Sequence, residues 1–139
     1  MGSLVISAGP YTFTARLETE KAPLTCAAFL KLLPFKKNVL HVRWSGESTW
    51  VPLGDLALDV PAENATTYPL PGEILLYPGG VSETEVLIPY GRTQFGSKAG
   101  LLAGNHFLTI VSGLENLSEL GRLTLWEGAQ PITIDRAND

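Results

Sequence analysis

The chain has 139 residues, of which 45% are hydrophobic and 17% are charged, and this length suits one domain with its own core. An apolar fraction of this size excludes a chain that is disordered over most of its length. Ten Lys and Arg residues against fourteen Asp and Glu residues give a net charge of -4, which excludes the basic surface that nucleic acids require. We therefore expect a single domain over residues 1–139 without a nucleic-acid partner.

The sequence shows no pattern typical of a membrane-spanning segment, a signal peptide or a disulfide framework. No apolar run approaches the roughly 20 residues that span a bilayer, and the first basic residue, Arg16, comes too late for the start of a signal peptide. The single cysteine, Cys26, excludes an internal disulfide and a thiolate-rich metal site. We expect a cytoplasmic protein that needs no membrane, metal or cofactor.

The first half of the chain predicts a hairpin, a helix and two further strands. Residues 3–6 and 11–17 flank a Gly-Pro turn, and the second stretch alternates apolar and polar residues. A helix is expected from Pro23 to Leu33, because Cys26, Phe29, Leu30 and Leu33 form an apolar stripe and Pro34 follows. Strands are expected next at 39–44 and 49–51, before a long surface loop over 54–72.

The second half predicts central strands and a short helix. Residues 74–77 and 85–90 are nearly continuous apolar runs on either side of Pro78-Gly79-Gly80. A loop over 92–104 is expected to cover one end of the sheet, and a strand follows at 106–111. Ser112 and Glu115 match a capping box for a short helix that ends at Gly121. The strands expected last, 123–126 and 131–134, would form a final hairpin.

About eight short strands with two helices predict a mainly β fold. The arrangement that suits so apolar a chain is a small closed or nearly closed barrel, because closure leaves no unpaired strand edge. Each helix is then expected to cover one open end of the barrel.

Several stretches resemble the cyclophilins, in chain order APLTCAAFLKLL, LHVRW, GEILLYP, LLAGNHFLTIVSGLENL and PITI. Three others, HVRWSGESTWVPLGDL, YPGGVSETEVLIPYG and GNHF, resemble a bacterial family of uncharacterised cyclophilin-like proteins, a domain of unknown function. The resemblance implies a cyclophilin-like barrel without an established activity. It makes Arg43 the counterpart of the catalytic arginine of the isomerases, but residues 49–54 lack the glutamine of their groove, and Leu101 stands where they carry a tryptophan. Little or no prolyl isomerase activity is therefore expected.

The strand expected over 39–44 carries the most suggestive polar residues. Alternation would place His41 and Arg43 on one face, with Glu47 in the loop just beyond and Trp50 on the neighbouring segment. If they converge, they form a cleft with an aromatic wall that suits a small carboxylate-bearing ligand or a short peptide. Any catalysis would rest on His41, Arg43 and Glu47. The plain alternative is a surface ion pair between Arg43 and Glu47 beside a core tryptophan.

Two alternative functions involve catalysis. In a prolyl isomerase, the Arg43 guanidinium would hydrogen-bond the prolyl nitrogen and weaken amide resonance. In a small-molecule enzyme, Glu83 and Glu85 would point the same way and share acid–base work, although solvated charges at the start of a strand explain them as well. His106 is the third candidate of such an enzyme. Because alternation would place it on the same face as Leu108, a position in the core or on the rim of the barrel explains it as well. The ligand-binding candidates are Trp50, Glu83, Glu85, Tyr90 and His106.

The low charged fraction also bears on assembly. In a barrel of this size, the apolar strand faces exceed what one core and one helix can cover, so part of this surface is expected at a subunit contact. The sequence thus predicts a homo-oligomer, a dimer or larger.

Overall fold

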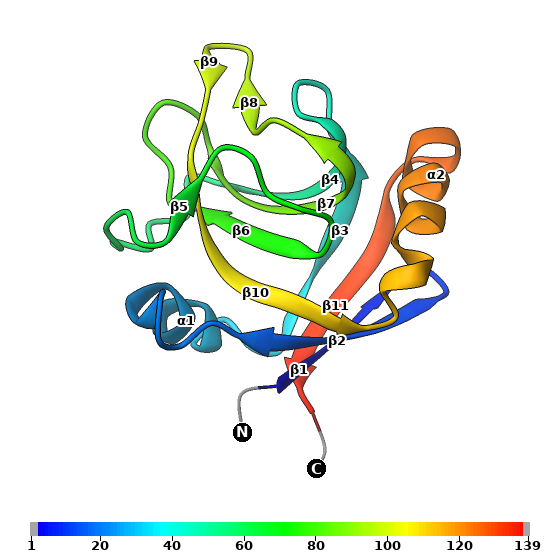
Figure 1. The fold of residues 1–139 in the computed structure, drawn as a ribbon, viewed down its shortest axis with the longest axis horizontal. Coiled ribbons are helices and arrows are strands. Elements are labelled where there is room, and N and C mark those ends of the chain that lie inside the picture. The colour runs from blue at the N-terminus through cyan, green and yellow to red at the C-terminus, as the bar shows by residue number, and fades with distance from the viewer. Residues whose placement is uncertain (1–2, 138–139) are drawn as a thin grey trace.

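A computed structural model describes residues 3–137, in which nine strands form one sheet and two form another (Figure 1). The large sheet contains β1 (Ser3–Ala8), β2 (Tyr11–Leu17), β3 (Phe35–His41), β4 (Gly46–Gly54), β5 (Ala65–Thr66), β6 (Glu73–Tyr77), β7 (Thr84–Thr93), β10 (Gly104–Ser112) and β11 (Gln130–Arg136). Their order is β2-β1-β11-β3-β4-β7-β6-β10-β5, and β10 also pairs with β2. Eight antiparallel strands therefore close into a barrel, which confirms the predicted fold.

The first and last strands, β1 and β11, lie next to the closing seam of the barrel. β1 lies between β2 and β11, with Leu4 paired with Arg136 and Ala8 with Ile132. The seam between β2 and β10 pairs Arg16 with Thr109. Pairing across the seam joins segments that are about 90 positions apart, so no edge of the barrel wall stays open.

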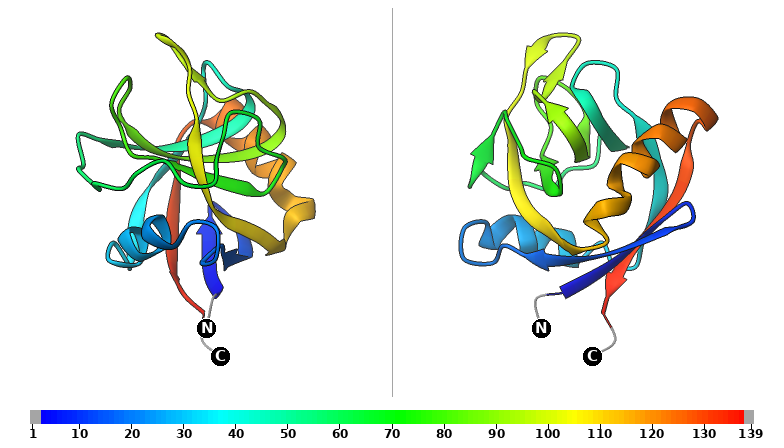
Figure 2. Two further views of the ribbon diagram at one scale, coloured as in Figure 1. Left: turned by 60° about the vertical axis from the view of Figure 1, so that its left-hand side comes forward. Right: turned by 45° about the vertical axis from the view of Figure 1, so that its right-hand side comes forward.

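Two helices cover opposite openings of the barrel, as Figures 1 and 2 show. Helix α1 (Pro23–Leu30) begins with proline at its first turn, as predicted, and buries Phe29 against the rings of Phe35 and Phe107, with centroids 5.2 and 5.0 Å apart. Helix α2 (Leu117–Glu127) buries Leu117 and Leu120 in the same interior cluster. Both helices thus complete the barrel core.

The structure corrects the second helix and the final hairpin. Residues 123–126, predicted as a strand, belong to α2, so β11 pairs with β1 and β3 and not with a hairpin partner. Gly121 does not end this helix but lies inside it. A glycine is needed there because any side chain would collide with the Tyr90 ring. Ser112 does not cap it either, since Gly113, with φ of 89°, precedes a 3-10 turn over 114–116.

Two earlier boundaries also differ from the prediction. Helix α1 ends at Leu30, three residues before the predicted end at Leu33. Strand β3 covers 35–41 instead of 39–44, so the chain leaves the sheet after His41. The alternation expected to continue through Trp44 therefore stops at His41.

The segment over 93–104 lies on the outside of the barrel wall and not over one end. It contains the small strands β8 (Gly96–Ser97) and β9 (Gly100–Leu101), which stand out from the barrel in Figure 2. Beneath it, a second buried cluster forms on the outer face of the sheet from Leu75, Tyr77, Leu87, Phe95 and Leu102. Within residues 3–137, no helix has both the length and the hydropathy that crossing a bilayer would need.

Candidate functional site

A pocket forms on the outer face of β4 and β7, and the alternation of these strands determines what lines it. Val51 and Val86 belong to the interior cluster, so their neighbours Trp50 and Glu85 face outward. Trp50 pairs with Leu87, and Pro52 pairs with Glu85, which makes Trp50 and Glu85 diagonal neighbours on this outer face.

We call this cavity the β4–β7 pocket; its volume is about 160 Å³. Besides the two strands, three connections enclose it: the β3–β4 turn, the β6–β7 connection and the β8–β9 hairpin. Four of the predicted site residues line it together: Arg43, Trp50, Glu83 and Glu85. The remaining lining residues are Val42, Trp44, Ser45, Ser82, Gly96, Ser97 and Lys98.

The β3–β4 turn is held against the β8–β9 hairpin by Ser45, which is buried. Its Oγ donates to the carbonyl oxygen of Gly96 at 3.2 Å and accepts from the Gly96 amide at 3.1 Å, while the Ser45 carbonyl accepts from the Gln94 amide at 3.1 Å. Gly46 follows with φ of 91°, and a Cβ there would lie 2.7 Å from the Arg92 carbonyl oxygen. This turn therefore holds Arg43 at the pocket.

Glu85 is the most unusual group of the pocket, because only 6% of it is exposed. Burial, and then the charge of Glu83, raises the pKa of its carboxyl from 4.5 to about 8. Among the described residues no group hydrogen-bonds this carboxyl, and no side-chain oxygen that is sealed from solvent lacks a partner. The Glu85 oxygens are therefore open to the pocket.

Glu83 stands at the rim of the same pocket and is exposed. Its Oε1 accepts a hydrogen bond from the Gly54 amide at 3.1 Å. The two carboxyls thus share a pocket but differ in burial, so the interpretation of both as solvated strand-start charges is wrong for Glu85.

His41 and Tyr90 form a second group, on the side of the barrel that α2 covers. The Nδ1 of His41 lies 2.9 Å from the carbonyl oxygen of Val42, and its Nε2 lies 2.8 Å from the Tyr90 hydroxyl. Because a carbonyl can only accept, Nδ1 carries the hydrogen in the neutral ring, and Nε2 accepts from Tyr90. Burial, followed by the charge of Glu47, raises the pKa of Tyr90.

Glu47 belongs near this second group and not to the β4–β7 pocket. Its carboxylate accepts from the Arg92 amide at 2.8 Å, and it lines an open groove with Tyr90, Arg122 and Trp126. The single cleft expected from His41, Arg43, Glu47 and Trp50 is therefore wrong. Arg43 and Trp50 line the β4–β7 pocket, whereas His41 and Glu47 lie near Tyr90. The physical reason is that β3 ends at His41, so Arg43 lies in the turn and does not share the strand face of His41.

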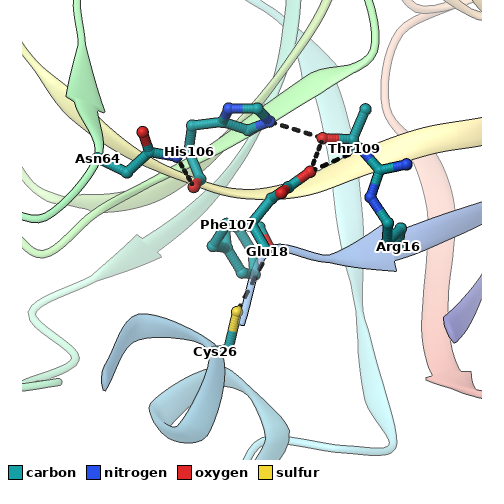
Figure 3. Close-up of polar contacts among 7 residues, drawn as sticks. All are labelled: Arg16, Glu18, Cys26, Asn64, His106, Phe107 and Thr109. Atoms are coloured by element: carbon teal, nitrogen blue, oxygen red, sulfur yellow. Dashed lines mark hydrogen bonds and ion pairs between the residues drawn. The ribbon is translucent and has the colours of Figure 1, made fainter. Parts of the chain in front are cut away.

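His106 lies in a third place, on β10 just before the seam that this strand forms with β2 (Figure 3). A bulge in β10 shifts the register between His106 and Leu108, and both Phe107 and Leu108 are fully buried. The predicted common face of His106 with Leu108 is therefore wrong. The Nε2 of His106 lies 2.7 Å from the Thr109 hydroxyl, which donates to Glu18 at 2.5 Å.

A charged pair completes this seam network. The Arg16 guanidinium donates to Glu18 at 3.0 Å, from the strand position that pairs with Thr109. Burial alone would raise the pKa of Glu18, but the hydrogen bonds from Thr109 and Arg16 outweigh it, and the pKa lies below its ordinary value. Because the single hydrogen of the Thr109 hydroxyl goes to Glu18, the His106 Nε2 must donate to that hydroxyl.

Seven lining residues of the β4–β7 pocket were not among the predicted site residues, and two of these, Trp44 and Lys98, bear most on its chemistry. Trp44 is the last residue of the strand predicted over 39–44, but it lies in the β3–β4 turn and is 58% exposed. Lys98 falls within the loop predicted over 92–104, and it lines the pocket. Signals for both exist: Trp44 directly precedes the Ser-Gly turn, and Lys98 is the one charged residue between positions 93 and 104.

Among the solved structures that share this fold are those of two other proteins. The structure of McbB in complex with tryptophan matches with a TM-score of 0.74 and 19% identity, over 98% of this chain and 45% of McbB. The chain thus spans less than half the length of McbB. The solution structure of the hypothetical protein AF2241 from Archaeoglobus fulgidus matches with a TM-score of 0.64 and 18% identity, over 97% of this chain and 94% of that protein. Identities this low show a common fold alone.

No curated protein matches the chain in sequence. Residues 4–135 match DUF3830, a family described as protein of unknown function, in agreement with the domain of unknown function expected from the sequence. The chain belongs to the DUF3830 family.

Proposed function

We propose that this protein binds a small organic molecule in the β4–β7 pocket. The observation that carries the proposal is Glu85, a nearly buried carboxyl that no described group hydrogen-bonds and that opens into a cavity. Burying a carboxyl without a partner destabilises the folded protein. A ligand that hydrogen-bonds the carboxyl would offset this cost. Ligand binding thus explains a buried carboxyl without a partner, which the stability of the fold does not explain.

The size and walls of the pocket limit the ligand. A volume of about 160 Å³ is below the roughly 300–1,000 Å³ of pockets for drug-sized molecules, so the ligand, or the part of it that enters, has few atoms. Trp50 is half-buried and offers a flat apolar wall. The structure of McbB in complex with tryptophan supports small-molecule binding by a protein of this fold.

Thermal unfolding of the full chain with single compounds tests the proposal. A panel of amino acids, small amines, small carboxylates and a proline tetrapeptide is suitable. A ligand at 100 times its dissociation constant adds about 2.7 kcal/mol of apparent stability. We expect Trp50→Ala to abolish this stabilisation and Trp126→Ala, which removes a 76% exposed tryptophan outside the pocket, to leave it intact. Stabilisation by no compound, or its equal loss in both variants, contradicts the proposal.

We also propose that the cyclophilin-like barrel has little or no prolyl isomerase activity. Arg43 lines the same pocket as the two carboxyls Glu83 and Glu85, whereas an isomerase groove is expected to pair the arginine with a glutamine. NMR exchange on a proline tetrapeptide should give the same rate with the wild type, with Arg43→Ala and with buffer. An accelerated rate that Arg43→Ala loses and the exposed Arg136→Ala keeps would establish the isomerase instead.

A further inference from the structure

Resting on that proposed function, we infer that the β4–β7 pocket recognises a free amino acid or a similarly small zwitterion. Its ammonium group would lie against Glu85 and Glu83, and its carboxylate against Arg43 and Lys98. The apolar part of the molecule would pack on Trp50. The inference rests on which charged groups line the pocket, on where they come from, and on how they are left unpaired.

The acidic side of the pocket suits an ammonium ion. Glu83 and Glu85 enter from one segment, the start of β7 and the connection before it. Glu85 is the buried member and Glu83 the rim member, and Glu83 already accepts one hydrogen bond from the Gly54 amide. An ammonium group has three donors and no acceptor, so it can bond both carboxylates at once, which a neutral alcohol or amide cannot do with the same strength.

The basic side of the pocket comes from other segments. Arg43 enters from the β3–β4 turn and Lys98 from the β8–β9 hairpin. Arg43 offers a planar fork that fits a carboxylate in a bidentate manner. A ligand that carries one positive and one negative group therefore finds partners for both of them in one cavity.

The four charged side chains do not neutralise one another in pairs. Among residues 3–137, the ion pairs are Arg16–Glu18 and Arg122–Glu119, and neither involves a residue of the β4–β7 pocket. Opposite charges that line one small cavity without pairing remain available to a ligand. A zwitterion would pair with both signs and leave the net charge of the site balanced.

Proton release provides a specific signature of this ligand class. Burial and Glu83 raise the pKa of Glu85 to about 8, so at pH 7 most of this carboxyl is protonated in the free protein. The charged groups that line the pocket with it are Glu83, Arg43 and Lys98. An ammonium ion favours the ionised carboxylate, so binding would release close to one proton to the buffer. Affinity would then rise between pH 6 and pH 8, by up to tenfold per pH unit.

Calorimetry of the full chain with matched compounds tests the inference. The probes are L-alanine, ethylamine and propionate, and a larger set of L-tryptophan, tryptamine and indole-3-propionate. We expect one amino acid to bind at least tenfold more tightly than its own amine and its own acid. Titrations at pH 7 in two buffers of different ionisation enthalpy should show the release of nearly one proton. Equal affinity for the acid and the amino acid would overturn the inference.

Variants separate the two sides of the pocket. Glu85→Gln keeps the shape but cannot ionise, so it should lose the preference for the amine and the proton release, and keep weak binding of the acid. Arg43→Ala should lose the preference for the carboxylate and keep the proton release. Glu115→Gln and Arg136→Ala, at exposed positions outside the pocket, are the matched controls. If Glu85→Gln does not fold, Glu83→Gln should reduce the amine preference in the same direction.

The outcomes distinguish this inference from the function on which it rests. If no compound of either set or of the wider panel binds, the proposed function fails. If acids or neutral compounds bind and Trp50→Ala abolishes the binding, the proposed function stands and the zwitterion inference is wrong. Retention of the amine preference by a folded Glu85→Gln variant also overturns the inference.

Discussion

Replacing Glu85 by glutamine removes an acid from a nearly buried position while it keeps the size of the side chain. In the folded protein the pKa of this carboxyl is raised from 4.5 to about 8, so folding opposes its ionisation. Well below pH 4.5 the carboxyl is protonated in both the folded and the unfolded chain, so its ionisation does not change the free energy of unfolding there. Between pH 4.5 and pH 8 the unfolded chain ionises first, so the free energy of unfolding falls as the pH rises, and it levels off above pH 8.

The magnitude follows from the two pKa values. The step from 4.5 to about 8, at about 1.36 kcal/mol per pH unit, gives a ceiling of roughly 5 kcal/mol. Water can enter through the open side of the pocket and lowers this ceiling. We therefore expect the free energy of unfolding of Glu85→Gln to rise by about 2–5 kcal/mol relative to that of the wild type as the pH increases from 5 to 9.

Urea unfolding followed by tryptophan fluorescence at pH 5, 7 and 9 measures this gain. Every other titrating group contributes to both proteins, so the difference between wild type and variant isolates Glu85. Glu115→Gln, at an exposed position, should show no such change with pH. If the free energies of unfolding of wild type and Glu85→Gln differ by the same amount at all three pH values, the reasoning is refuted. Such a result would mean that water solvates the carboxyl in the folded protein as it does in the unfolded chain.

Two further substitutions test the other groups. Thr109→Val removes the hydroxyl that bonds both Glu18 and His106, so we expect a loss of about 1–3 kcal/mol at pH 7. That contribution is present above the ordinary pKa of Glu18 and is lost at acid pH, and an NMR titration that found the pKa of Glu18 unchanged in the variant would contradict the network. Gly121→Ala forces a methyl group onto the Tyr90 ring, so we expect about 1–3 kcal/mol of destabilisation and a shifted His41 imidazole resonance. Wild-type stability in urea would argue against this close contact.

The barrel was predictable because its strands carry local signals. Strand β2 alternates buried and outward residues as its sequence suggests, and Pro23 begins α1 as expected. Helix α2 was not predictable to the same extent, because Gly121 resembles a helix end in the sequence. In the fold this glycine allows a close approach to Tyr90, a contact between segments about 30 positions apart that no local pattern reveals.

The structure groups the predicted site residues differently from the sequence prediction. Arg43, Trp50, Glu83 and Glu85 do line one pocket, but His41 was joined to Arg43 on the assumption of a continuous strand. Strand β3 ends where its pairing with β4 ends, at His41 opposite Thr49, and that limit depends on the partner strand. Lys98 reaches the pocket because the 93–104 segment covers the outer wall, which is a tertiary arrangement and not a local one.

The pairing of β1 with β11 has a consequence for how the chain reaches its fold during synthesis. The first strand of this domain is hydrogen-bonded along one side to its last strand, since Leu4 pairs with Arg136. The β1–β2 hairpin must therefore wait, with both outer edges unpaired, until β10 and β11 have left the ribosome. A circular permutant that links β11 directly to β1 and opens the chain in the 55–64 connection would turn this distant pairing into a local hairpin. Such a permutant should fold faster than the natural order of elements allows.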